Sequence, residues 1–62
     1  MERYTIADAA LVSGKVLVRR VSDGKVARCK LSWLEPVYGE TYQAKSRTKA
    51  IRLDGLDWTT EG

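Results

Sequence analysis

The sequence predicts a mainly β domain of four short antiparallel strands preceded by a short helix. Two runs rich in β-branched residues, Val16–Val21 and Val26–Trp33, flank a polar turn and are typical of a hairpin. Two later runs, 41–45 and 49–53, alternate apolar with polar residues, which favours strands. An alanine-rich N-terminal stretch ends at Gly14, as helices commonly do.

The length of the chain, 62 residues, indicates a single domain over residues 1–62. A chain of this size buries roughly 60% of its unfolded surface. Its one cysteine, Cys29, cannot form an internal disulfide and fits a reducing compartment. No apolar run approaches the ~20 residues of a membrane span, and the first ten residues lack a signal-peptide core. We therefore expect a cytoplasmic protein with no membrane partner.

The first expected element is a short helix over about residues 6–12. Thr5-Ile6-Ala7-Asp8 has the spacing of a capping box, with Asp in place of Glu, and alanines follow it. Gly14 then takes the position after the helix C-terminus. The alternative for this stretch is a strand through Tyr4–Ile6.

The central element is a hairpin over residues 15–33, because Asp23-Gly24 is a strong hairpin-turn signal. Pairing Val21 with Val26 would set Val18 opposite Cys29. The apolar face then receives Val16, Val18, Ala27, Cys29, Leu31 and Trp33. The other face receives Arg19, Arg28 and Lys30 beside Leu17 and Val26.

The second half of the chain completes the sheet. Pro36 cannot donate to a strand ladder, so central pairing should stop there. We expect a loop over 37–40, a third strand over 41–45, a polar turn and a fourth strand over 49–53. Residues 59–62 should form a loose, flexible end. Four such strands have the dimensions of a small SH3-like barrel, whose closure would leave no exposed sheet edge.

Several segments resemble, in order, the WYL domain, an SH3-like or Sm-like barrel of bacterial regulators. Val18–Lys25 is similar to its first strand and turn, and Leu34-Glu35-Pro36 to the end of its second strand. Tyr42 with Ala44 is similar to its tyrosine-centred strand, and Ala50–Leu56 to its last run. The Trp-Tyr-Leu tripeptide is absent, and Tudor-type barrels show a similar order. The resemblance implies a barrel that binds a ligand, nucleic acid or protein segment without catalysis.

Positive charge is concentrated in the middle of the chain. Residues 15–30 hold six basic residues and one aspartate, and residues 45–52 add four basic residues and no acid. After Leu53 the charged residues are all acidic. This distribution suits a polyanionic partner. The alternative is a solvated strand face that is charged to prevent edge-to-edge aggregation.

The expected function is non-catalytic, regulatory or nucleic-acid binding through this basic sheet face, with an acidic protein surface as the other candidate partner. If the second and fourth strands present outward residues to one side, their cations can contact several phosphates together. An exposed tyrosine could stack on unpaired bases. The expected nucleic-acid-binding residues are Arg19, Lys25, Arg28, Lys30, Tyr38, Lys45, Lys49 and Arg52.

Several chemistries lack the residues that they need. The chain has no histidine, so it can form neither a Ser–His nor a Cys–His dyad. The glycine spacing matches no phosphate-binding loop. Asp54 and Asp57 supply only two carboxylates, whereas calcium is coordinated by six to eight oxygen atoms. Cys29 should be an inert core residue. We expect no catalytic residue, no metal and no cofactor.

Three alternatives stay open at this stage. Tyr4–Gly14 and Val18–Lys25 resemble the first and recognition helices of excisionase-type winged helices, which bind duplex DNA. A phage structural or connector protein, which docks onto a larger assembly, would also suit a small basic domain. The third alternative is a protein that binds and inhibits a host enzyme. A domain with so small a core could also form a homo-oligomer.

Overall fold

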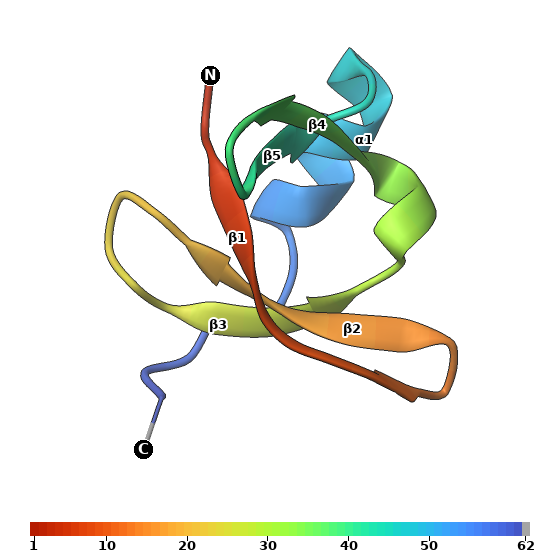
Figure 1. The fold of residues 1–62 in the computed structure, drawn as a ribbon, viewed down its shortest axis with the longest axis vertical. Helices are drawn as coiled ribbons and strands as arrows, with labels where there is room; N and C mark the ends of the chain where they lie inside the picture. Colours follow the sequence, from red (N-terminus) through yellow and green to blue (C-terminus); the bar gives the residue numbers. More distant parts are fainter. Residues whose placement is uncertain (62) are drawn as a thin grey trace.

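The computed structural model describes residues 1–61 and shows a mainly β fold with one C-terminal helix (Figure 1). Five antiparallel strands form one open sheet in the order β3-β2-β1-β5-β4. The elements in chain order are β1 (Tyr4–Val12), β2 (Lys15–Arg20), β3 (Val26–Cys29), the 3-10 helix η1 (Leu31–Trp33), β4 (Leu34–Tyr38), β5 (Thr41–Ala44) and α1 (Arg47–Asp54). The closed four-stranded SH3-like barrel is not confirmed.

The N-terminal helix expected over 6–12 is wrong, because these residues lie in β1. Tyr4 is buried and pairs with both Arg20 of β2 and Tyr42 of β5, so long-range pairing outweighs the local helix propensity of the alanines. Ser13 and Gly14 both have positive φ, 54° and 75°, which is the geometry of a two-residue hairpin turn. Gly14 therefore turns a hairpin instead of ending a helix.

The central hairpin is confirmed as β2 and β3, but its register differs by two residues from the expected one. Val18 pairs with Ala27, and Val16 with Cys29. The connection is longer than an Asp-Gly turn because Arg20 N–H donates to Lys25 O at 2.8 Å and Gly24 N–H to Arg20 O at 2.7 Å. A shift of two residues preserves the faces. The expected inward residues of both strands are buried: Val16, Val18, Ala27 and Cys29.

The hairpin was expected to extend to Trp33, but β3 ends at Cys29. Residues 31–33 form η1, which leaves Leu31 exposed and Trp33 half-buried against the core. Val18 and Arg20 lie in β2, so the interpretation of this segment as a winged-helix recognition helix is wrong. Arg20 is on the inward side of β2, and its guanidinium stacks on the ring of Trp58.

The third strand is confirmed as β5, and it pairs with β4, part of which was expected to be a loop. Pro36 lies opposite Tyr42, yet β4 is the last strand of the sheet, where a missing N–H is tolerated. The loop is reduced to Gly39 and Glu40, and Gly39 has a φ of 53°.

The fourth strand expected over 49–53 is wrong, because α1 covers this segment and packs against β5 (Figure 1). Ser46 caps the helix by accepting a hydrogen bond from Lys49 N–H at 3.2 Å. The helical period turns Ala50 and Leu53 toward the core and leaves Ile51 66% exposed. Leu53 is fully buried and is the residue that anchors α1.

One core holds these elements together. Its buried members are Tyr4, Val16, Val18, Cys29, Leu34, Ala44 and Leu53. Trp33, expected on the apolar face, and Tyr42 are partly buried against it. Within the described part of the chain, no helix is long and apolar enough to cross a membrane.

Candidate functional site

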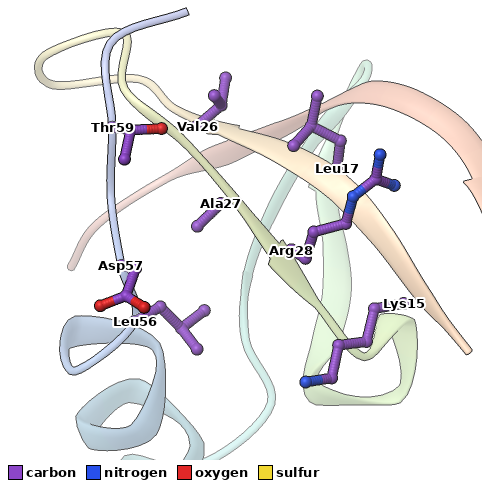
Figure 2. Close-up of a pocket in the computed structure, with 8 residues that line it drawn as sticks. All are labelled: Lys15, Leu17, Val26, Ala27, Arg28, Leu56, Asp57 and Thr59. Carbon is purple, nitrogen blue, oxygen red and sulfur yellow. The ribbon is translucent and has the colours of Figure 1, made fainter. Parts of the chain in front are cut away.

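The outer face of β2 and β3 carries a row of cations around an apolar strip. Period-two alternation directs the side chains of these residues away from buried Val16 and Val18. We define the basic face by Lys15, Leu17 and Arg19 of β2, Val26 and Arg28 of β3, and the following Lys30. Leu17 pairs with Arg28 and Arg19 with Val26, so each arginine lies opposite an apolar residue and the two arginines are diagonal neighbours on the face. Figure 2 shows the Arg28 guanidinium beside Leu17, and the Lys15 side chain pointing the other way.

A groove of about 360 Å³ lies along the edge of β3, between the basic face and the C-terminal segment, residues 57–61 (Figure 2). Thr59 pairs with Val26 through two hydrogen bonds, Val26 N–H to Thr59 O at 2.8 Å and Thr59 N–H to Val26 O at 3.0 Å. Trp58 N–H donates to Leu56 O at 2.9 Å, and this tight turn draws the chain away from β3 next to Arg28. The groove is the gap that results. Its lining residues are Lys15, Leu17, Val26, Ala27, Arg28, Leu56, Asp57 and Thr59.

Arg28 lines the groove and has both main-chain and side-chain hydrogen-bond donors. The main chain of Val26 points toward the C-terminal segment, and strand alternation gives Arg28, two residues later, the same direction. No backbone partner for the N–H or C=O of Arg28 is found outside the strand pairing within residues 1–61. Its guanidinium Nη1 donates to Ala10 O at 3.4 Å, a long bond that leaves most of its donor capacity free.

The charges on the basic face are only partly neutralised. Arg19 forms an ion pair with Glu61, and Asp57 lines the groove opposite Lys15 and Arg28. Neither Lys15 nor Arg28 forms an ion pair with any residue in the described part of the chain. The face therefore has a net positive charge.

The C-terminal segment is attached to the core through Trp58. Its ring stacks on buried Tyr4 with centroids 5.7 Å apart, and Arg20 lies 4.6 Å from its centroid. The indole Nε1–H donates to Leu53 O at 2.8 Å. Because its ring contacts both Tyr4 and Arg20 and its N–H is hydrogen-bonded, Trp58 is held in place and is not free to stack on bases.

Two pKa values reflect this anchoring. Burial raises the pKa of Tyr4 to about 12, so its hydroxyl stays protonated beneath Trp58. Arg20 donates to both carboxylate oxygens of Asp23, at 2.6 and 3.1 Å, and this lowers the pKa of Asp23 to about 2. The Asp23 hydrogen bond raises the pKa of Arg20 in turn. The Arg20–Asp23 pair thus fixes the loop between β2 and β3.

The structure brings together only part of the expected site. Arg19, Arg28 and Lys30 share the basic face, and Lys25 ends the adjoining loop. The others lie elsewhere. Lys45 follows β5, and Lys49 and Arg52 lie on α1, so they are not on a strand beside β2. Lys49 Nζ lies 5.4 Å from the centroid of Trp33. Tyr38 is 66% exposed at the turn between β4 and β5.

Lys15 belongs to the site but is absent from the predicted residues. It lies at the start of β2, on the same side as Leu17 and Arg19, and it lines the groove. Lys15 is two residues before Leu17 and four before Arg19, and this period-two spacing was the signal that could have identified it.

The thiol of Cys29 and the acidic side chains are candidate sources of chemical reactivity or metal binding. Cys29 is 1% exposed, and burial raises the pKa of its thiol to about 11, so it is not a nucleophile at neutral pH. Within residues 1–61, no cluster of three or more His, Cys, Asp or Glu side chains is placed to hold a metal ion. The arrangement of the basic face suits binding of an anionic chain.

No family model, no curated protein and no solved structure matches the chain.

Proposed function

We propose that this chain is a non-catalytic nucleic-acid-binding protein whose basic face contacts the phosphate backbone. The observation that carries the proposal is the gathering of Lys15, Arg19 and Arg28, with Lys30, on one face of two paired strands. Alternate residues of a strand are roughly 7 Å apart. That spacing is within a Debye length of about 8 Å at physiological salt, so the cations act on one polyanion together.

Arg28 is the residue best equipped to hold a phosphate. Its guanidinium is directed toward Ala10 O of β1 and can donate two parallel hydrogen bonds to phosphate oxygens. Strand alternation directs its main-chain N–H toward the groove. Leu17 and Leu56 supply apolar contact for a sugar beside that phosphate. Phosphate contacts position a nucleic acid without reading its sequence, so we expect little sequence preference.

Base stacking is a minor part of this proposal. The ring of Trp58 is held by Tyr4 and Arg20, and exposed Tyr38 is at the turn between β4 and β5. Affinity should therefore come from counterion release, which makes it strongly dependent on salt.

The test is a fluorescence anisotropy titration of labelled single-stranded and duplex oligonucleotides at 50 and 200 mM salt. Three phosphate contacts predict that the affinity falls roughly 20- to 40-fold between these two salt concentrations. Arg28→Ala with Lys30→Ala should weaken binding and leave the melting temperature nearly unchanged. Undetectable or salt-independent binding of both oligonucleotides would overturn the proposal.

An acidic protein surface is the second candidate partner, and one observation favours it. The C-terminal segment, which carries Asp57 and Glu61, is itself an acidic peptide that lies against the basic face. Competition between an oligonucleotide and polyglutamate separates the candidates. Displacement of the oligonucleotide only at a large molar excess of polyglutamate favours nucleic acid, and tighter binding of polyglutamate favours the protein partner.

A further inference from the structure

We infer that the C-terminal segment, residues 57–61, competes with nucleic acid for the basic face and so weakens binding. This inference rests on the proposed function, since it concerns regulation of the same site. Three contacts of the segment with the face carry it, and each involves a part of the site that the anionic ligand would use.

The first contact is main-chain pairing. Thr59 forms a pair of hydrogen bonds with Val26, at 2.8 and 3.0 Å, and so lies beside the edge of β3 as a single added residue of strand. Val26 is one of the two apolar residues of the basic face, and it is buried. The segment therefore already covers one end of the surface on which a nucleic acid would lie.

The second contact is an ion pair, and the third is the position of a carboxylate at the groove. Glu61 forms an ion pair with Arg19, and the Asp57 carboxylate lies at the groove that Lys15 and Arg28 also line. Figure 2 shows Asp57 and Leu56 on one side of the groove and the two cations on the other. Glu61 occupies Arg19 Nη2, so a phosphate that binds this atom replaces Glu61. Asp57 adds a second negative charge at the groove.

The attachment of the segment allows it to leave without unfolding the domain. Trp58 is fixed by Tyr4, Arg20 and the Leu53 carbonyl. Beyond it, the segment is held by the Thr59 pairing and by one ion pair whose side chains are 38% and 49% exposed. Exposed ion pairs are weak and are screened by salt. Displacement of residues 59–61 therefore leaves Trp58 in the core.

The experiment compares Glu61→Gln with Glu40→Gln, which makes the same change in charge at the exposed turn between β4 and β5. Loss of a competing surface ion pair predicts that Glu61→Gln binds an oligonucleotide about two- to fivefold more tightly than the wild type. Glu40→Gln should change the affinity by less than about 1.5-fold, because its charge is screened from the basic face. Equal effects of the two variants would overturn the inference.

A second measurement detects the displacement directly. Amide hydrogen exchange of Thr59 should be slow in the free protein and become faster on saturation with the oligonucleotide, while the Trp58 indole stays protected. Binding with Thr59 still protected would overturn the inference and leave the proposed function intact. If neither the wild type nor Glu61→Gln binds, the proposed function fails, and the inference fails with it.

Discussion

The chain has two basic regions of similar charge but different construction. On the basic face, Lys15, Arg19 and Arg28 extend from two hydrogen-bonded strands, and Lys15 and Arg28 line a groove. Around α1, Lys45 precedes the helix, Arg52 is exposed on it, and Lys49 lies over Trp33. A run of basic residues in a sequence therefore does not predict a binding surface by itself. The secondary structure decides which of these side chains lie on the same face.

The two regions also differ in what holds them. The hairpin of β2 and β3 contributes four buried inward side chains, whereas α1 contributes Leu53 alone. The fixed strands make the basic face a surface of defined spacing. The helix has one buried side chain and one cap, so the substitutions at Leu53 and Ser46 should act on stability and not on the phosphate contacts.

The largest effect is expected at Leu53, which is fully buried. Leu53→Ala should cost about 2–5 kcal/mol of unfolding free energy, because it removes the anchor of α1 and leaves a cavity. A core of this size supplies about 3–5 kcal/mol, so the variant should be largely unfolded in a thermal or urea melt.

Ile51→Ala is the control in the same helix. Ile51 is 66% exposed, and its loss should change the free energy of unfolding by less than about 0.5 kcal/mol. Similar melting of the two variants would contradict the packing of α1 described above.

The next largest effect is on binding. Lys15→Ala with Arg28→Ala should weaken oligonucleotide binding roughly tenfold or more and reduce the salt slope by about 1.4–1.8, because two phosphate contacts are lost. Lys45→Ala with Arg52→Ala removes the same charge near α1 and should weaken binding less than about twofold. Anisotropy titrations measure both pairs. Equal losses would mean that net charge, and not the basic face, determines affinity.

A smaller effect is expected at the cap of α1. Ser46→Ala removes the hydroxyl that accepts from Lys49 N–H and should cost about 1 kcal/mol of unfolding free energy. Thr48→Ala, on the exposed side of the same helix, removes no cap and should leave stability unchanged or slightly raised. Chemical denaturation separates the two, and an equal loss in both variants would contradict the capping role.

The smallest effect concerns Asp23 and pH. The pKa of Asp23 is lowered from 3.8 to about 2 by Arg20. The ionised carboxylate therefore stabilises the fold above about pH 4, and this contribution is lost as the pH falls toward 2. The wild type should melt slightly above Asp23→Asn at neutral pH, and the two melting temperatures should converge between pH 4 and 2. A constant difference across that range would contradict the Arg20–Asp23 contact.

The hairpin could be predicted from the sequence because its signal is local and repeats every two residues. The faces of β2 and β3 follow from that period, and a register that differs by two residues does not change them. The register itself depends on the loop between Arg20 and Lys25, whose hydrogen bonds have no distinct sequence signature.

The two wrong elements failed for different physical reasons. The alanines of β1 favour a helix locally, but the pairing of Tyr4 with two strands decides the outcome. The run over 49–53 is too short for its period to separate strand from helix. Ser46, as an N-cap followed by helix-forming residues, was the available evidence for α1.

The basic character of the site could be predicted, but its membership could not. Strand parity placed Arg19, Arg28 and Lys30 together. Lys49 and Arg52 were added through the wrong fourth strand, and Lys45 as the last residue of the expected third strand. The groove could not be predicted, because it arises where the turn at Leu56–Trp58 draws the chain away from β3.

The most direct test of the basic face is a nitrogen-15 NMR titration of the whole chain with an oligonucleotide at low salt. The proposal predicts the largest amide shift changes at Lys15, Leu17 and Arg28 and only small changes at Lys49 and Arg52. Changes confined to Lys49 and Arg52, or the absence of any change at saturating oligonucleotide, would contradict it.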